Sequence, residues 1–199
     1  ALIAAVESGA NAVYMAGNQF GARAYANNFD EDGLKEAIRF AHLRDVLINI
    51  TVNTIVDDEE IPALKEYLLF LREAGADAII VQDLAVIEMA KKGIGDIRKE
   101  IRIPLHASTQ CAIRTPEQAQ FLESLGFSRL ILERELSLDQ IKAIRSSVGC
   151  ELEFFVHGAL CVCYSGQCYL SEMISGRSAN RGACIQACRS RYDLIDSTG

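Results

Sequence analysis

Six short apolar runs, most of them rich in valine and isoleucine, constrain the fold of this chain more than any other feature. They cover residues 12–17, 46–53, 78–83, 103–109, 129–133 and 151–157. Runs of this length that are apolar nearly throughout are typical of strands buried on both faces, as in parallel sheets. The sequence therefore predicts six parallel strands.

Amphipathic stretches with helical periodicity separate most of these runs. They cover residues 30–43, 59–74, 115–125 and 137–147. Asp30, Thr115 and Ser137 are suitable N-cap residues, and Pro116 stands at a first helical position, where proline is tolerated. The chain opens inside a helical pattern without an initiator methionine, so we expect a fragment truncated at both ends.

A repeated helix–glycine–strand pattern indicates how these elements connect. The string 5–14 recurs at 71–80 and more loosely at 122–131, each time with a glycine between a helix end and an apolar run. This is the return from helix to strand in a parallel α/β fold. No glycine-rich phosphate fingerprint follows a strand, which disfavours a Rossmann fold. We expect an incomplete parallel (β/α)8 TIM-type barrel over residues 1–158, followed by a cysteine-rich metal-binding segment over 159–199.

The charge distribution and hydropathy exclude some functional classes. The net charge of −7 argues against a protein that coats nucleic acid over its whole surface. Residues 161–199 are an exception, because four arginines give them a net charge of +1. The longest apolar stretch, 154–164, is too short to span a membrane, so we expect no membrane partner. Seven cysteines without a secretory leader favour a reducing, cytoplasmic environment.

Five of the seven cysteines fall within 28 residues near the end of the chain. Cys161, Cys168, Cys184 and Cys188 follow a Cys-x6-Cys-x15-Cys-x3-Cys pattern, and Cys163 is a fifth. Thiolates suit iron–sulfur clusters and zinc alike, but the spacing lacks the paired Cys-x2-Cys knuckles of a zinc ribbon. The sequence thus favours an iron–sulfur centre, with a structural zinc site or cysteines buried as small hydrophobes as alternatives. Cys111 and Cys150 are predicted to pack in the core.

Polar residues at the predicted strand ends are further site candidates, because barrel active sites form there. The candidates for catalysis are Asn53, Arg134, Glu135 and His157, with loop caps or core polar groups as the alternative roles; Gln82, Asp83, Ser108 and Gln110 are second in rank. The arginines that could contact RNA phosphates are Arg177, Arg181, Arg189 and Arg191, unless they belong to a solvated loop.

A protease interpretation finds less support in the residues. His-Glu-x-x-His is absent, and a serine or cysteine nucleophile would need His42, His106 or His157 as its base. His106 and Ser108 are predicted on one side of a strand, without an identifiable acid beside them.

Two strings in the cysteine-rich segment resemble the signature of the peptidase U32, or collagenase-like, family. One is Glu153-x-Phe155-x-x-Gly158-Ala159-Leu160-Cys161-x4-Gly166-x-Cys168-x-Leu170-Ser171, and the other is Asn180-Arg-Gly-x-Cys184-x-Gln-x-Cys188-Arg189. Segments 11–17, 108–110 and 134–137 also resemble the family, so the similarity covers essentially the whole chain.

The resemblance implies a function as well as a fold. Better-understood members are oxygen-independent hydroxylases that act on tRNA uridine, on an rRNA cytidine or in ubiquinone synthesis, and a [4Fe–4S] cluster and prephenate are associated with them. The second string is most similar to the rRNA-modifying branch. The resemblance implies Cys161, Cys168 and Cys184 as cluster ligands, with Cys188 or a residue further downstream as the fourth.

We therefore expect an iron–sulfur-dependent RNA hydroxylase whose first three ligands lie close together even without a cluster. A peptidase and a zinc-stapled binding module are the alternatives. The RNA target, the oxygen donor and the oligomeric state do not follow from the sequence.

Overall fold

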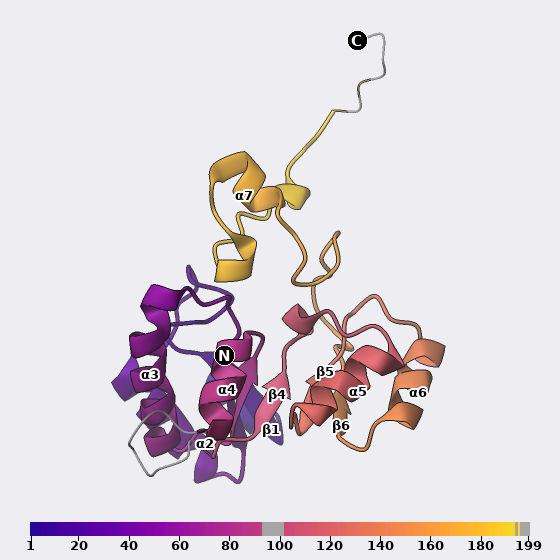
Figure 1. Cartoon of the computed structure of the whole chain (residues 1–199). Helices are drawn as coiled ribbons and strands as arrows, with labels where there is room; N and C mark the ends of the chain where they lie inside the picture. The colour runs from indigo at the N-terminus through magenta and orange to yellow at the C-terminus, as the bar shows by residue number, and fades with distance from the viewer. Residues whose placement is uncertain (93–101, 194, 196–199) are drawn as a thin grey trace.

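Six parallel strands form one sheet in chain order, as the apolar runs predict. In the computed structural model, which describes residues 1–92, 102–193 and 195, the strands are β1 Ala12–Ala16, β2 Leu47–Val52, β3 Ala78–Val81, β4 Leu105–Ala107, β5 Arg129–Ile131 and β6 Glu151–Glu153. The sheet curls into a half-barrel (Figure 1). The predicted incomplete (β/α)8 barrel is therefore confirmed, although residues 93–101, 194 and 196–199, which belong to the two predicted domains, lie outside the described part.

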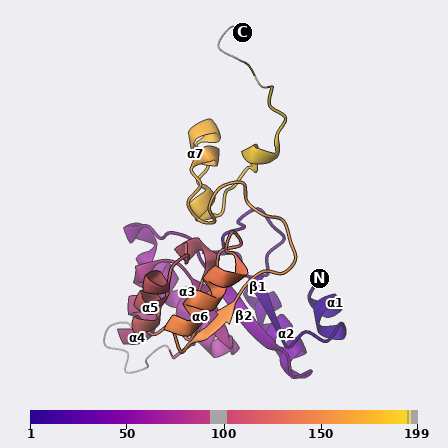
Figure 2. The same ribbon diagram turned by 90° about the vertical axis from the view of Figure 1, so that its right-hand side faces the viewer.

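Helices connect successive strands on one side of the sheet (Figure 2). The connecting helices are α2 Glu31–His42, α3 Ile61–Ala74, α4 Leu84–Lys92, α5 Pro116–Ser124 and α6 Leu138–Ser147, whereas α1 Leu2–Glu7 precedes the first strand and α7 Leu170–Ser175 follows the last; the single turns η1 Asp58–Glu60, η2 Thr109–Cys111, η3 Ala179–Arg181 and η4 Ala187–Arg189 are 3-10 helices. The predicted N-caps are confirmed, because the side chains of Asp30, Thr115 and Ser137 accept backbone N–H bonds from the first turns. Two helices, α4 and α7, fall outside the predicted stretches. None of the helices in the described residues combines the length and apolar character needed to cross a membrane.

The strand predicted over residues 151–157 is shorter than expected. β6 ends at Glu153, whose carbonyl accepts the N–H of Leu132, and residues 154–157 are exposed. β5 ends at Ile131 and the chain then turns, so residues beyond Glu153 have no neighbouring strand with which to pair. His157 therefore lies in the connection to the cysteine-rich segment rather than at a strand end.

The two faces of the sheet differ in chemistry. Side chains such as Ile50, Val81 and Leu130 are fully buried in the core between the sheet and the helices. The alternate positions form one row across all six strands, because the parallel pairing places Ala16, Thr51, Ile80, His106, Arg129 and Glu151 side by side. TIM barrels usually fill this inner face with branched apolar side chains. Here four of the six residues in the row are polar or charged.

Candidate functional site: the cysteine-rich segment over the barrel mouth

The cysteine-rich segment lies over the carboxyl ends of the strands, where α7 stands clear of the sheet (Figure 1). Two backbone hydrogen bonds fix its second half to the loops that follow β1 and β2. Ala24 donates to the carbonyl of Gly182 at 3.0 Å, and Ile55 donates to the carbonyl of Asn180 at 3.2 Å. The segment thus covers the end of the barrel at which active sites are assembled in this architecture.

Glycines make this close approach possible. Gly182 has a φ of +82°, and a Cβ there would stand 2.6 Å from the carbonyl oxygen of Gly21. Gly166 has a φ of +73°, and a Cβ there would stand 2.6 Å from backbone atoms of Gln110. Any other residue would be strained in conformation and would also force the two backbones apart.

Arg181 fastens the segment to the barrel through an ion pair. Its guanidinium donates to both carboxylate oxygens of Glu60, at 3.0 and 2.8 Å, and to the carbonyl of Ile55 at 2.9 Å, while Asp57 lies 3.1 Å away. The hydrogen bond from Arg181 is the main reason why the pKa of Glu60 is lowered. Arg181, predicted as a phosphate contact, is therefore held mainly by acidic groups of its own chain.

Three further arginines contact the segment. Arg114 stacks on the Tyr164 ring, with its guanidinium carbon 4.2 Å from the ring centre. Arg134 donates to the carbonyl of Ala159 at 2.9 Å and lies over the Phe155 ring. Arg189 donates to the carbonyl of Leu160 at 3.0 Å. Arg134 and Arg189, predicted for catalysis and RNA contact, thus help to hold the cysteine loop.

The cysteines of the segment are free thiols near the surface. Cys161, Cys163, Cys184 and Cys188 are exposed and Cys168 is half-buried. The pKa of Cys163 is raised, first by partial desolvation and then by its interactions with Cys168 and Cys161. Free, accessible thiols on a glycine-rich loop fit the chemistry of a thiolate-bound metal.

Cys184 lies in a different setting. Its sulfur accepts from the Ser171 hydroxyl at 3.7 Å and from the Gln186 N–H at 3.4 Å. Within the described residues, no group of three or more histidine, cysteine or acidic side chains is arranged to hold a metal ion. The close group expected of Cys161, Cys168 and Cys184 is therefore not seen among the described residues, and the assignment of the four ligands stays a prediction. Cys111 and Cys150, by contrast, pack against the core as predicted.

The other predicted site residues have separate places. Asn53 is buried at the end of β2, accepts from the Ala22 N–H at 3.0 Å and donates to the Ser108 hydroxyl at 3.2 Å. Asp83 accepts from the N–H groups of Val56 and Ala85, which is a loop-capping role. Glu135, His157, Arg177 and Arg191 are exposed, and Arg177 lies over the Tyr25 ring.

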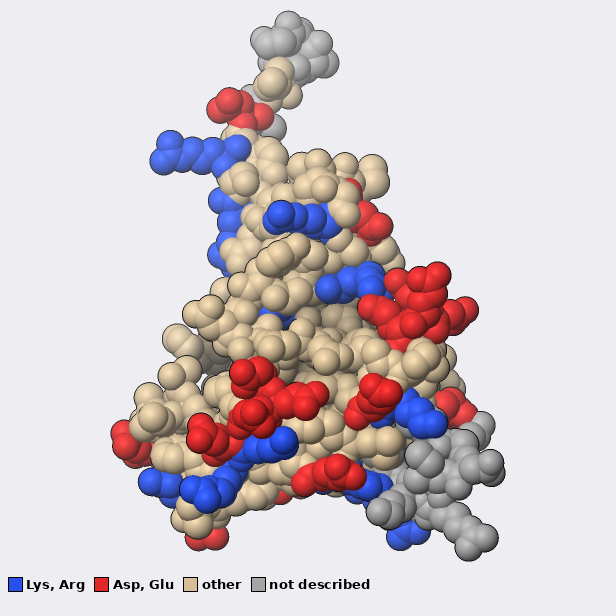
Figure 3. Space-filling view, turned by 90° about the vertical axis from the view of Figure 1, so that its left-hand side faces the viewer, with Lys and Arg blue, Asp and Glu red and all other residues tan. Residues whose placement is uncertain are grey.

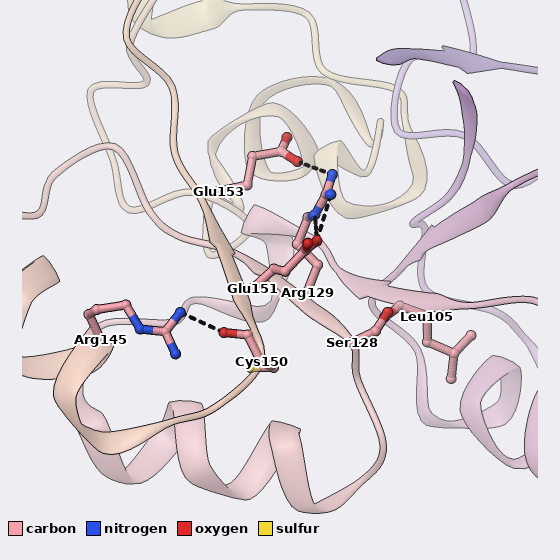
Figure 4. A network of polar contacts seen from close by, with 7 residues as sticks. All are labelled: Leu105, Ser128, Arg129, Arg145, Cys150, Glu151 and Glu153. Carbon is pink, nitrogen blue, oxygen red and sulfur yellow. Dashed lines mark hydrogen bonds and ion pairs between the residues drawn. The ribbon is translucent and has the colours of Figure 1, made fainter. Parts of the chain in front are cut away.

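An ionic network occupies the inner face at the start of β5. Figure 4 shows the Arg129 guanidinium between two carboxylates of β6, at 2.6 Å from Glu151 and 3.1 Å from Glu153. Burial and the nearby Arg129 charge lower the pKa of His106 to about 4. His106 is therefore neutral at pH 7, which makes it a hydrogen-bonding group rather than a cation.

Glu133 and Arg114 are the functional candidates that the sequence interpretation missed. Glu133 is 1% exposed at the carboxyl end of β5, and the Nε atom of Arg114 lies 3.1 Å from its Oε2 atom. The signal was present in the sequence. A charged residue closes an apolar run in which Arg129, Ile131 and Glu133 alternate with two leucines, so it stands on the inner face.

Comparisons with known proteins identify relatives over nearly the whole chain. The sequence model described as peptidase family U32 matches residues 1–199. The chain is 49% identical over 195 residues to the 23S rRNA 5-hydroxycytidine C2501 synthase of Escherichia coli K12, an alignment that covers 98% of this chain and 28% of that protein. It is 36% identical to the tRNA hydroxylation protein P1 of Bacillus subtilis 168 (98% and 45% covered) and 34% identical to a collagenase of Porphyromonas gingivalis W83 (98% and 48% covered).

The chain spans less than half the length of these curated relatives. Among solved structures, the U32 peptidase Mk0906 superposes with a TM-score of 0.60 over 72% of this chain and 60% of that one, at 19% identity. At this identity the superposition supports the fold alone.

Proposed function

Since the chain belongs to peptidase family U32, we propose that it is the barrel portion of an RNA-modifying hydroxylase whose cysteine-rich segment holds a [4Fe–4S] cluster. The observation that carries the proposal is the position of that segment over the carboxyl mouth of the barrel. A redox centre there would stand directly above the place where a barrel enzyme binds its substrate.

RNA as the substrate is supported by the relatives and by the charge distribution. Two of the most similar proteins carry names that refer to hydroxylation of rRNA and tRNA. Basic side chains follow the cysteine-rich segment in the upper half of Figure 3, whereas acidic side chains are frequent on the barrel below. Arg177 and Arg191 are the exposed arginines there that we assign to phosphate contacts.

The cluster would be held by Cys161, Cys168, Cys184 and Cys188, and it would supply one-electron redox chemistry when bound. Zinc at the same thiols is the structural alternative. Independence from O2 and the use of prephenate rest on the family resemblance and are part of the proposal. The chain's own contribution is to hold the thiols over the mouth, through Arg181 on one side and Arg114 and Arg134 on the other, while Arg189 joins two parts of the segment itself.

Replacement of a predicted ligand in the full-length protein tests this proposal. Anaerobically purified Cys161→Ala should lose the broad visible absorbance of an iron–sulfur cluster. In cells that lack their own copy of the gene, it should also lose the modified nucleoside, measured by mass spectrometry of total RNA. Cys111→Ala, a change at a core cysteine, is the matched control and should keep both.

The helix content of each variant must be compared by circular dichroism, because loss of a metal can unfold the loop around it. A folded, colourless Cys161→Ala protein that still modifies RNA at the parental rate would contradict the proposal. A colourless, zinc-containing parent would favour the zinc-stapled module.

A peptidase is the second candidate, because a collagenase is among the relatives. Neither His106, which is buried and neutral, nor the exposed His157 is hydrogen-bonded to an acid in the part of the chain that the structure describes. Peptide cleavage by the purified parent that survives cluster removal would nevertheless place the peptidase first.

A further inference from the structure

Buried polar atoms without hydrogen-bond partners gather at the mouth of the half-barrel. Among the described residues, the atoms at the mouth include Oε1 of Gln82, both carboxylate oxygens of Glu133, Nε of Arg134 and the hydroxyl of Ser165, and Nδ1 of His106 lies deeper on the inner face. Native proteins leave few such groups, because an unsatisfied buried polar atom costs about 1–3 kcal/mol. Their concentration at one end of one sheet therefore calls for a ligand that satisfies them.

Three of these groups belong to the inner wall of the barrel. Ile79 and Val81 pack in the helix-facing core, as do Leu105 and Ala107, so Gln82 and His106 face the other side of β3 and β4. Leu130 and Leu132 place Glu133 on the same side of β5. Gln82 and Glu133 thus form a polar arc at the mouth, continuous with the hydrogen-bonded pair of Asn53 and Ser108, while His106 faces the same side deeper in the barrel, at the level of Arg129.

Glu133 is the costly member of this arc. Its side chain is fully inaccessible, and burial raises its pKa, partly offset by Arg114. The Arg114 Nε atom lies close at 3.1 Å but is not aligned to donate a hydrogen bond to either oxygen. A buried carboxylate without aligned donors destabilises a fold, and such groups are retained where a substrate needs them.

We propose that Glu133 contacts the RNA base directly and that its carboxylate accepts a hydrogen bond from an N–H donor on the edge of that base. The inference rests on the proposed RNA substrate and names the residue that recognises it. Cytosine offers an amino N–H and uracil a ring N–H on this edge, and enzymes that modify a base read that edge in a closed pocket. Entry requires the Tyr164 side of the cysteine-rich segment, which rests on Arg114, to move away.

The test is Glu133→Gln in the full-length protein, which keeps the shape of the side chain and removes its charge. The rate of RNA modification, followed by mass spectrometry, should fall at least about tenfold, which corresponds to about 1.4 kcal/mol and lies within the range for a base-edge contact of this kind. The thermal midpoint should stay equal or rise, because the neutral amide is easier to bury than a carboxylate. Cluster absorbance should be unchanged, and Glu117→Gln, on the exposed first turn of α5, should behave like the parent.

A folded Glu133→Gln protein with the parental rate would overturn this inference and leave the proposed function intact. A parent that modifies no RNA would overturn both. If Glu133→Gln fails to fold, the double variant Arg114→Gln/Glu133→Gln leaves no unpaired charge and should fold without activity. Parental activity in the folded double variant would also overturn the inference. So would a loss of fold in both the single and the double variant, because the Arg114–Glu133 pair would then have a purely structural role.

Discussion

At the scale of single residues, two glutamates at the barrel mouth are paired with arginines in opposite ways. Glu60 receives two aligned hydrogen bonds from Arg181 and is partly solvated, so its ionised form is favoured and its pKa is lowered. Glu133 is fully buried beside a misaligned Arg114, so its pKa is raised. We interpret the Arg181–Glu60 pair as a structural clamp between the segment and the barrel. In the second pair, we interpret Glu133 as a carboxylate whose missing hydrogen bonds a ligand would supply.

The clamp should be dependent on pH. The pKa of Glu60 is lower in the folded protein than its ordinary value of 4.5, so the folded state binds the proton less readily than the unfolded state. Its stabilisation is thus present above pH 4.5 and is lost as the pH falls through the folded pKa. A double-mutant cycle of Arg181→Gln and Glu60→Gln should give a coupling of about 0.5–1 kcal/mol in urea unfolding at pH 7, and a smaller coupling as the pH is lowered to 3. Equal coupling at both values would contradict the assignment.

At the scale of elements, the cysteine-rich segment docks onto the barrel through backbone contacts as well as side chains. Gly182 meets Gly21, Gly166 meets Gln110, and the carbonyls of Asn180 and Gly182 accept the N–H groups of Ile55 and Ala24. Such contacts require that Gly182 and Gly166 carry no side chain, because a Cβ at either position would stand 2.6 Å from backbone atoms of the barrel. The glycine positions therefore matter to the docking as much as the arginines do.

Gly182→Ala should loosen the segment from the barrel. The new Cβ would add a clash with the Gly21 carbonyl to the strain of a positive φ, whereas Gly176→Ala adds only the strain, since Gly176 has a φ of +69° and open space around it. Hydrogen exchange of residues 161–189 should accelerate in Gly182→Ala, with the strand amides of β2 and β3 unchanged. Gly176→Ala is the matched control and should destabilise by about 1 kcal/mol. Similar hydrogen-exchange rates of residues 161–189 in the two variants would show that the close approach of Gly182 to Gly21 does not contribute to the docking of the segment.

At the scale of the whole molecule, an acidic barrel carries a basic cap. The barrel, residues 1–160, has a net charge of −8, and the cap, residues 161–199, has a net charge of +1; together they give the overall charge of −7. Polyanionic RNA should therefore approach the cap rather than the barrel flanks. Because Arg181 is engaged by Glu60 and Asp57, the cap offers fewer arginines to RNA than the sequence suggests.

RNA binding should separate the arginines by role. Arg177→Gln/Arg191→Gln should weaken binding of the full-length protein and lower the slope of log K against log salt by about 0.7 for each phosphate of single-stranded RNA that the variant no longer neutralises. Arg181→Gln should leave the slope nearly unchanged and lower the unfolding midpoint instead. Fluorescence anisotropy at several salt concentrations measures the first effect. A larger slope change in Arg181→Gln than in the double variant would return Arg181 to the RNA-binding group.

The sequence by itself determined the strands and the helix caps, because these depend on local periodicity and residue type. Each observed strand lies inside a predicted run, and Asp30, Thr115 and Ser137 cap the helices that they were predicted to cap. Local pattern failed where apolar residues fill most of a helix, as in α4. It also failed for strand ends, because the length of β6 depends on where β5 stops.

Tertiary structure alone decided which polar groups share a site. Arg181 and Glu60 are separated by 121 residues, and Arg114 meets Tyr164 only after the cysteine-rich segment folds back over the strand ends. The sequence analysis selected Glu135, yet Glu135 is exposed on a turn, whereas Glu133, two residues earlier, is buried on the inner wall. Burial and pairing set the pKa and the cost of a charge, and both arise from long-range packing that a local pattern does not contain.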